Sequence, residues 1–380
     1  MEKLCLYIDG YIYAAVSSKY FLLYNFEECI GKTFPVDNEL TYNTLCSLTE
    51  PLNSYSIIID KNLLQLKDFH DIVSFLRQHY WGDCITIKGN NKPTTFIPIC
   101  NLENYKQKGL NSIFEITIAI NNEEKFLSHP IQKQIPYIYQ SKSYKEIDWN
   151  CLKEFIFKLS SDITINITGG DIFKYSRFRE LYDTLSCFND VRFFFKEEYI
   201  NKTFNISNPS IIFVSPTLYD ESICKDYDTT SCSFYFIVEN EKELNIANLI
   251  KKEIRNANIT ILPFWNNNDT FFEDFVFFER NDELLQNKSK TDIYINKNIN
   301  KNFYGNLFID PNGYIYTSYN LPPIGNYKDS IEELIENATF HNQAWYFTRK
   351  HGECKECIYQ LFCPSISNYE LFLNKLKSCK

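Results

Sequence analysis

Residues 163–171 read ITINITGGD, in which three isoleucines alternate with polar residues before two glycines and an aspartate. A short run of β-branched residues bounded by a turn signal is typical of a strand. Similar runs recur through residues 112–265, and stripes of apolar residues three and four positions apart lie between several of them. This alternation predicts an α/β fold built on a parallel sheet or a partial (β/α) barrel. The expected strands are Ile113–Ile120, Ile163–Ile167, Val191–Phe195, Ile211–Val214, Phe234–Val238 and Ile259–Leu262.

The helices expected between these strands carry their apolar residues on one face. Their stripes are Leu152, Phe155, Ile156 and Leu159; Phe178, Leu181, Tyr182 and Leu185; and Leu244, Ala247, Ile250 and Ile254. Residues 190–230 show no comparable stripe, so we expect the barrel to be incomplete.

The first 88 residues follow a different pattern, which predicts a small separate α+β module. Asp9 and Gly10 separate two strand-like runs, and Asp-Gly is a strong signal for a β-hairpin. The expected strands are Leu4–Ile8, Tyr11–Val16 and Tyr20–Tyr24, and the expected helices are Glu39–Leu48 and Asp68–Tyr80. Residues 90–93, which read NNKP, mark the expected end of this module.

Composition argues against several classes of protein. The net charge is −9 and only seven of the 39 basic residues are arginine, which disfavours a nucleic-acid partner because such binding needs a concentrated basic face. The eleven glycines form no dinucleotide-binding or P-loop pattern. Asp9 interrupts the N-terminal segment early, and no run of 18 apolar residues occurs. We therefore expect a cytoplasmic protein that binds neither membranes nor nucleic acid.

Four of the thirteen cysteines lie within the last 27 residues, beyond an expected hairpin at Asp310-Pro311-Asn312-Gly313. They are Cys354, Cys357, Cys363 and Cys379. Close spacing of the first three can wrap three corners of a tetrahedral centre, and the fourth thiolate returns from later in the chain. The pattern predicts a metal site that holds either zinc or a [4Fe-4S] cluster. Four incidental thiols, or disulfides in an oxidising compartment, are the alternative interpretation.

The cysteine spacing after the hairpin resembles the SPASM domain, the C-terminal auxiliary-cluster module of radical-SAM peptide-modifying enzymes. The four cysteines match the ligand set of one of the two clusters that such a module carries. The second cluster is missing: Ser367 stands where its local cysteine would lie, Ser318 stands in the position after the hairpin, and no cysteine precedes the hairpin. The resemblance therefore implies one [4Fe-4S] cluster, with zinc as the alternative metal.

Gly169, Gly170 and Asp171 resemble the GGE motif that follows the second strand of a radical-SAM barrel, where glycines let the backbone approach SAM. Taken alone, a GGD triplet is more often an ordinary turn. The CxxxCxxC motif that defines this superfamily is absent, because residues 121–140 contain no cysteine. The triplet is thus interpreted as a remnant of a SAM site, and no SAM-cleaving cluster is expected.

A chain with these features resembles the pseudo-radical-SAM proteins encoded beside a genuine radical-SAM enzyme in Bacteroidales-type ribosomal peptide (RiPP) systems. Further motifs that look familiar from that family are Lys92-Pro93, Ile97-Pro98-Ile99, the NLPPIG stretch at residues 320–325 and the stretch 354–370. The resemblance implies three domains. These are a winged-helix-like precursor recognition module over residues 1–88, a degenerate radical-SAM-like partial barrel over 89–295 and a SPASM-like domain over 296–380.

The function implied by the resemblance is that of a non-catalytic accessory protein in peptide maturation. It would bind a ribosomally made precursor peptide and a genuine radical-SAM enzyme, with which it forms a heterodimer. The peptide would add a strand to an edge of the N-terminal sheet, and Leu4–Ile8 and Tyr20–Tyr24 are the edges we expect. A small α+β cap packed on the barrel is the alternative interpretation of the N-terminal module.

Two other functions fit the sequence. In the first, the chain would be an enzyme that uses non-SAM chemistry in the barrel cleft. In the second, it would be an electron-transfer module. Carboxylates near expected strand or helix ends are the candidates for acid-base chemistry, and they are Asp171, Glu180, Asp220 and Glu221.

Overall fold

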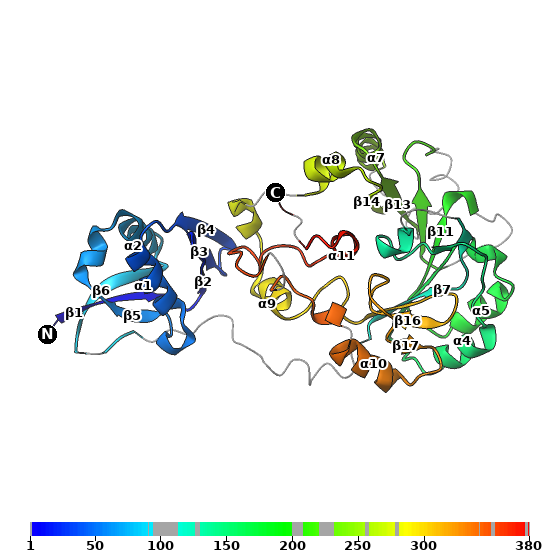
Figure 1. Ribbon diagram of the computed structural model, residues 1–380, viewed down its shortest axis with the longest axis horizontal. Coiled ribbons are helices and arrows are strands. Elements are labelled where there is room, and N and C mark those ends of the chain that lie inside the picture. Colours follow the sequence, from blue (N-terminus) through cyan, green and yellow to red (C-terminus); the bar gives the residue numbers. More distant parts are fainter. Residues whose placement is uncertain are drawn as a thin grey trace. The chain divides into compact units, whose positions relative to one another are not determined.

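The computed structural model describes residues 2–89, 91–93, 113–125, 130–199, 208–219, 232–254, 258–277, 281–341, 343–350, 354–376 and 379. They form two compact units (Figure 1). The described residues of the first unit lie within 1–103, 279–298 and 348–365, and those of the second within 104–278, 299–347 and 366–380. Each unit therefore collects distant stretches of the chain. The three consecutive domains expected from the sequence stay a prediction.

The first unit contains two antiparallel sheets of three strands each, in the orders β5-β1-β6 and β2-β3-β4. The strands are β1 (Glu2–Ile8), β2 (Ile12–Val16), β3 (Tyr20–Asn25), β4 (Ile30–Pro35), β5 (Ser56–Ile59) and β6 (Gly82–Lys88). Two helices, α1 (Glu39–Thr49) and α2 (Lys67–His79), join them in one apolar core. Both helices lie close to their expected positions. Strands β4, β5 and β6 were not anticipated from the sequence.

The hairpin expected at Asp9-Gly10 is wrong. β1 pairs with β5 and β6, whereas β2 pairs with β3, so the chain crosses from one sheet to the other at this point. A two-residue hairpin turn of the expected kind needs positive φ angles, and neither Asp9 nor Gly10 has one. The backbone N–H of Asp9 instead donates to the carbonyl of Trp81 at 3.0 Å.

The expected edge strands are also wrong. β1 lies between β5 and β6, and β3 lies between β2 and β4, so each is the central strand of its sheet. Both are strongly apolar, and a central strand has the most neighbours to bury such residues against. Edges available for pairing must therefore be sought on β2, β4, β5 and β6.

The second unit is built on a nine-stranded sheet in the order β14-β13-β12-β11-β10-β7-β15-β16-β17. Its parallel strands are β7 (Glu115–Ala119), β10 (Thr164–Thr168), β11 (Val191–Lys196), β12 (Ser210–Val214), β13 (Cys232–Val238) and β14 (Asn258–Pro263). All six strands expected from the sequence are present, and they are parallel neighbours in chain order. The prediction of an α/β chain with a mostly parallel sheet is confirmed at this coarse level.

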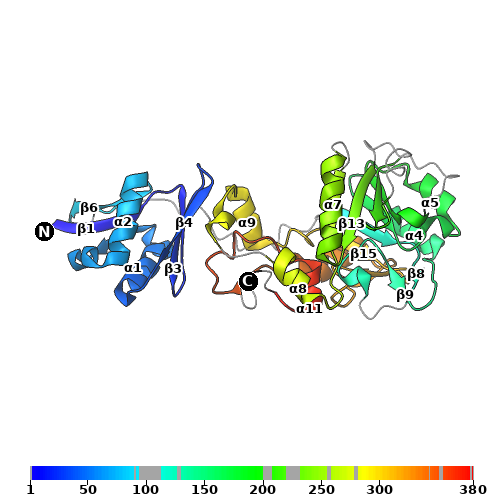
Figure 2. The same cartoon turned by 90° about the horizontal axis from the view of Figure 1, so that it is seen from above.

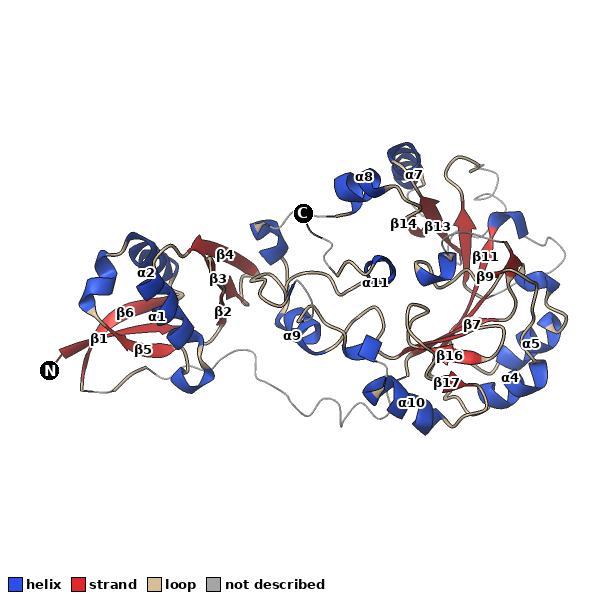
Figure 3. Cartoon of the chain, viewed as in Figure 1, coloured by secondary structure: helices blue, strands red, loops and turns tan. Residues whose placement is uncertain are grey.

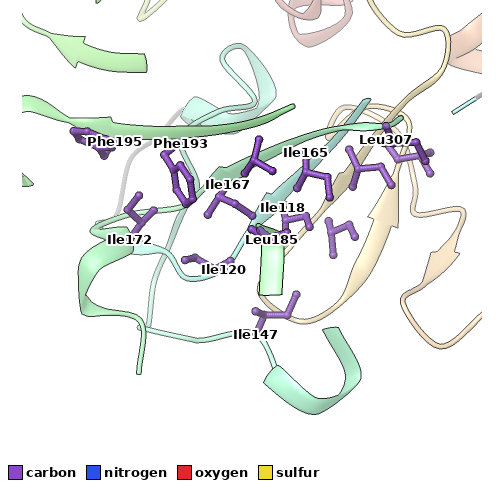
Figure 4. Packing of buried hydrophobic residues seen from close by; sticks show 14 of the residues in the cluster. Ile118, Ile120, Ile147, Ile165, Ile167, Ile172, Leu185, Phe193, Phe195 and Leu307 are labelled. Carbon is purple, nitrogen blue, oxygen red and sulfur yellow. The ribbon is translucent and has the colours of Figure 1, made fainter. Parts of the chain in front are cut away.

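Helices α4 (Trp149–Ile156), α5 (Phe178–Leu185) and α7 (Glu241–Glu253) follow strands β7, β10 and β13. Figure 3 shows α4 and α5 flanking the sheet, and in Figure 2 α7 lies alongside β13. Their apolar stripes pack against one face of the strands, where Ile118, Ile165 and Ile167 gather with Phe193 and Leu185 (Figure 4). We call this the helix face. The opposite face of the sheet carries Phe194, Phe213, Tyr235 and Ile237 and is called the inner face.

The expected C-terminal hairpin is present, but it extends the same sheet. β15 (Asn306–Ile309) pairs with β7 in parallel and with β16 (Tyr314–Tyr316) in antiparallel fashion, and β17 (Gly325–Asn326) follows. Gly313 takes a φ of +84° in the turn, where an added Cβ would meet the ring of Tyr327 at 1.7 Å. Two short strands, β8 (Glu123–Glu124) and β9 (Gln140–Ser141), form a separate parallel pair.

The remaining helices are α8 (Asp269–Phe271), α9 (Lys290–Asn298), α10 (Ile331–Phe340) and α11 (Asn368–Leu373). α9 belongs to the first unit, and the other three belong to the second. None of the described helices has the length and apolar character that crossing a membrane requires.

Candidate functional site

Three of the predicted metal ligands lie on successive turns of one segment in the first unit. The N–H of Cys357 donates to the carbonyl of Cys354 at 3.0 Å, and the N–H of Cys363 donates to the carbonyl of Tyr359 at 3.1 Å. Cys354 and Cys363 are buried, whereas Cys357 is partly exposed. Helix α9 fixes the end of the segment, because the amide of Asn296 donates to the Cys363 carbonyl at 3.3 Å. Residues 354–363 are called the cysteine segment below.

The cysteine segment packs on the N-terminal sheet β2-β3-β4. Phe362 is fully buried, and its ring centroid lies 4.8 Å from that of Tyr24 and 5.9 Å from that of Tyr13. Leu22 joins the same cluster from β3. The hydroxyl of Tyr24 also bonds the backbone of Lys288, donating to its carbonyl at 2.5 Å and accepting from its N–H at 2.9 Å. Sheet and cysteine segment are therefore one packed body, although more than 300 residues separate them in the chain.

Cys379, the fourth predicted ligand, is buried and belongs to the second unit. Among the described residues, no three His, Cys, Asp or Glu side chains stand in a metal-ligating arrangement. The donor set itself fits a soft metal centre, because it consists of thiols and three of the four are buried. The four-cysteine site stays a prediction. His351 lies outside the described residues.

Gly169 and Gly170, the glycines of the predicted SAM-site remnant, pack against the chain that follows β7. A Cβ added to Gly169 would lie 2.5 Å from the carbonyl oxygen of Asn121, and one added to Gly170 would lie 2.4 Å from the backbone nitrogen of Glu123. Asp171 caps the following turn by accepting from the N–H of Phe173 at 3.2 Å. Close backbone approach is therefore the structural role of these glycines.

The segment after β7 folds back over the inner face of the sheet. Ile131, Ile135 and Ile138 pack there with side chains from β11 and β12, and the ring of Tyr137 stacks on Phe194 with centroids 4.4 Å apart. Within the described part of this segment, Ile131, Ile135 and Ile138 are therefore core residues.

Asp171 and Glu180, the two candidate acid-base carboxylates that the structure describes, each pair with a neighbouring basic side chain. Glu180 pairs with Arg177 at 2.7 Å on the surface of α5, and Asp171 pairs with Lys174 at 3.2 Å. Asp220 and Glu221 lie outside the described residues.

Side chains bond outward backbone groups at two of the four sheet edges that the structure describes in the first unit, those of β2 and β6. At the β2 edge, the hydroxyl of Tyr55 accepts from the N–H of Ala14 at 3.1 Å and donates to its carbonyl at 3.4 Å. Burial raises the pKa of Tyr55 to about 12, so the hydroxyl keeps the proton that it donates. At the β4 edge, Pro35 has no N–H to offer.

At the β6 edge, an ion pair blocks the outward backbone groups of Cys84. Arg77 donates to the Cys84 carbonyl at 3.3 Å, while the carboxylate of Asp83 accepts from the Cys84 N–H at 2.6 Å. Arg77 and Asp83 also bond each other at 2.7 Å, and this contact raises the pKa of the guanidinium. Side chains are thus placed where a foreign strand would pair.

The β5 edge is more open. Along a strand of an antiparallel pair, the N–H and C=O groups of successive residues point alternately toward the partner strand and away from it. The groups of Ile57 and Ile59 point toward β1, so those of Ser56 and Ile58 point outward. Lys92 donates to the outward carbonyl of Ser56 at 3.0 Å. No bond from another described residue covers the outward groups of Ile58, whose side chain is 41% exposed.

A groove of about 510 Å³ runs beside this edge. Its walls come from α1, β5 and the turn after β5, and the lining residues are Leu40, Asn43, Thr44, Ser47, Asn53, Ile57, Ile58, Ile59, Asp60, Leu63 and Lys92. The sequence pointed to the N-terminal module but not to this edge. β5 has only four residues, and its outward direction depends on its register with β1.

No protein-family model matches the chain, and no curated protein gives a significant sequence match. The functional argument therefore rests on the residues of the chain itself.

Proposed function

We propose that this protein is a non-catalytic accessory subunit that holds an extended peptide during the maturation of ribosomally made peptides. The observation that carries the proposal is the edge of β5, where no bond from a described residue covers the outward groups of Ile58, with the groove beside it. An extended peptide gains main-chain hydrogen bonds at such an edge, and the neighbouring groove selects its side chains. The exposed side chains of Leu40 and Ile58 offer apolar contacts to the peptide.

The parallel sheet of the second unit is proposed to be a degenerate radical-SAM barrel. The absence of cysteines from residues 121–140 and the packing of Ile131, Ile135 and Ile138 on the inner face support this proposal. A SAM-cleaving cluster needs an iron with an open coordination position, and this segment has no thiolate to hold one. The radical chemistry is therefore assigned to a genuine radical-SAM enzyme that forms a heterodimer with this chain.

The proposed SPASM-like part holds one [4Fe-4S] cluster through Cys354, Cys357, Cys363 and Cys379, with zinc as the alternative metal. A bound cluster would supply folding free energy and a site for electron transfer. The packing of Phe362 on Tyr24 links this segment to the winged-helix-like recognition module proposed for residues 1–88. The cysteine segment then holds sheet β2-β3-β4, which shares an apolar core with the sheet that contains β5.

The proposal is tested with a proline substitution at the open edge. Ile58→Pro removes the outward N–H and places a ring where the peptide would pair, while proline remains tolerable at an edge position. Thr86→Pro is the matched control, because Thr86 points its backbone groups outward on β6, the opposite edge of the same sheet. Binding of a fluorescently labelled candidate precursor peptide is followed by anisotropy.

We expect Ile58→Pro to weaken peptide binding by about tenfold or more, which corresponds to the loss of one or two hydrogen bonds. Thr86→Pro should bind as the unaltered protein does. Equal affinities for the two variants would remove β5 as the peptide site. Circular dichroism of both variants checks that the fold is retained.

A further inference from the structure

A cavity of about 220 Å³ lies in the second unit, at the carboxyl ends of β7 and β15. These two strands are parallel neighbours, and ligands of open α/β sheets bind in crevices at the carboxyl ends of parallel strands. None of its described lining residues lines the larger cavity, of about 720 Å³, at the carboxyl ends of β11, β12, β13 and β14. The smaller cavity is called the lysine pocket below.

The described lining of the lysine pocket carries positive charge only. Lys142 and Lys145 belong to it and no aspartate or glutamate does, although the whole chain has a net charge of −9. Apart from Pro311, the other described lining residues offer hydroxyl or amide groups. A lining of this kind suits a ligand with negative charge and several hydrogen-bond acceptors.

The ammonium group of Lys145 is held by a neutral partner from another segment of the chain. It donates to the side-chain oxygen of Asn312 at 2.7 Å, and it forms no ion pair with any described residue. An ammonium group has three N–H donors, so two of them are left for a ligand. The pocket therefore contains a fixed positive charge that no carboxylate in the described part of the chain neutralises.

Lys196, at the end of β11, shows how a lysine is neutralised elsewhere in the same unit. It donates to Glu123 at 2.6 Å and lies 3.7 Å from Glu198. Burial acts to raise the pKa of Glu123, but hydrogen bonds from Lys196 and Gln140 and the charge of Lys196 outweigh it, so this pKa is lowered. Lys145 has an amide oxygen where Lys196 has two carboxylates.

Buried groups hold the walls of the lysine pocket in place. Asn312 donates from its backbone N–H and its side-chain amide to Asp310 at 2.9 and 3.1 Å, and Asp310 is only 2% exposed. Asn122, which is also 2% exposed, accepts from the backbone N–H of Lys145 at 2.6 Å and donates to the carbonyl of Ser143 at 3.1 Å. The ammonium group is thus positioned in advance, which lowers the cost of binding a ligand.

The hydroxyl of Ser143 adds a further donor. Ser143 lines the pocket, and its hydroxyl forms no hydrogen bond with any described residue. Glu146, the carboxylate that follows Lys145 in the chain, is engaged outside the pocket. It accepts from the hydroxyl of Tyr144 at 2.7 Å and from that of Ser176 at 2.6 Å.

We propose that the lysine pocket binds the phosphate group of a small molecule, with Lys145 and Ser143 donating to its oxygens and Lys142 adding positive charge. A phosphate group at neutral pH carries close to two negative charges and three strong acceptor oxygens, which matches a lining with two ammonium groups. The volume holds a phosphate group and a small part of the molecule that bears it. The inference is independent of the peptide edge on β5 and of the predicted cluster.

The test is calorimetric titration of the full chain with inorganic phosphate at neutral pH, and with acetate as a singly charged probe. We expect phosphate to bind more tightly than acetate. Lys145→Gln should weaken phosphate binding by about tenfold, because a charge-assisted hydrogen bond is lost. Lys251→Gln is the control: it removes the same charge from an exposed position on α7, outside the pocket, and should leave binding unchanged.

A further variant, Lys145→Arg, keeps the positive charge and the donors, so its affinity for phosphate should stay within about threefold of the unaltered protein's. Circular dichroism of all variants checks that the fold is retained. Equal affinities for phosphate and acetate, or equal effects of Lys145→Gln and Lys251→Gln, would overturn the proposal. Failure of phosphate to bind would overturn it as well.

A second pair of probes identifies the molecule that bears the phosphate. Glycerol 3-phosphate represents a small molecule, and acetyl-Ala-phosphoserine-Ala-amide represents a phosphorylated peptide side chain. Tighter binding of glycerol 3-phosphate supports the proposal. Tighter binding of the phosphopeptide would overturn the assignment to a small molecule.

Discussion

Replacing Phe362 with alanine should destabilise the first unit by about 3–5 kcal/mol, the range found for buried Phe→Ala changes. Phe362 has no exposed surface, and its ring lies against the rings of Tyr24 and Tyr13. The substitution removes these ring contacts and leaves a cavity between β3 and the cysteine segment. The loss should fall on the N-terminal sheet, although the altered residue lies near the other end of the chain.

Hydrogen exchange of the β3 amides measures this effect locally, and urea unfolding measures the total loss. Leu52→Ala is the control in the same unit, because Leu52 is 96% exposed and its loss should stay within about 0.5 kcal/mol. If β3 exchanges equally slowly in the Phe362→Ala variant and in the control, the sheet and the cysteine segment do not form one packed body. The reasoning about the first unit would then be refuted.

Three further predictions concern Cys357, Gly170 and Glu123. Cys357→Ala should lower both the metal content and the melting temperature, and analysis of iron, sulfide and zinc in anaerobically purified protein identifies the metal; unchanged metal content would contradict the four-cysteine site. Gly170→Ala should destabilise the second unit by about 1–3 kcal/mol in urea unfolding, because its Cβ would lie 2.4 Å from the backbone nitrogen of Glu123. Glu123→Gln should cost about 1.5–3 kcal/mol at neutral pH, the range for hydrogen bonds to charged groups. Folding lowers the pKa of Glu123, so its carboxylate stabilises the folded protein at pH values above the ordinary glutamate pKa. This stabilisation is lost as the pH falls through the folded-state pKa of Glu123. The stabilities of the unaltered protein and the variant should therefore converge in acid.

The parallel sheet was predictable because its strands are buried on both faces. Such strands appear in the sequence as continuous apolar runs, and Ile211–Val214, which is buried throughout, is an example. The helices between them were predictable for a similar reason, since Leu181 and Leu185 repeat at the helical period and both are buried.

The N-terminal sheets were harder to predict because their pairing is not local. The chain does leave one strand for another at Asp9-Gly10, but the two strands belong to different sheets. The partners of β1 are β5 and β6, which follow roughly 50 and 80 residues later. A short strand such as β5 carries no periodic signal of its own. Strand pairing decides which strand becomes an edge, and register decides which of its residues face outward. The sequence states neither.

The cavity at the carboxyl ends of β11, β12, β13 and β14 had no signature in the sequence either. Gln140, Lys196 and Glu239 come from three separate segments, and only the folded sheet brings them around one space. The cysteine segment is the opposite case, because three of its thiols are neighbours in the chain itself.

The most direct test of the proposed function is reconstitution of peptide modification from purified parts. A candidate precursor peptide is incubated with SAM, reductant and a candidate partner radical-SAM enzyme, with and without this protein, and the product is followed by mass spectrometry. The account predicts modification only when both proteins are present, and no 5′-deoxyadenosine from this chain alone. Full modification by the enzyme without this chain, or accumulation of 5′-deoxyadenosine with this chain alone, would contradict it.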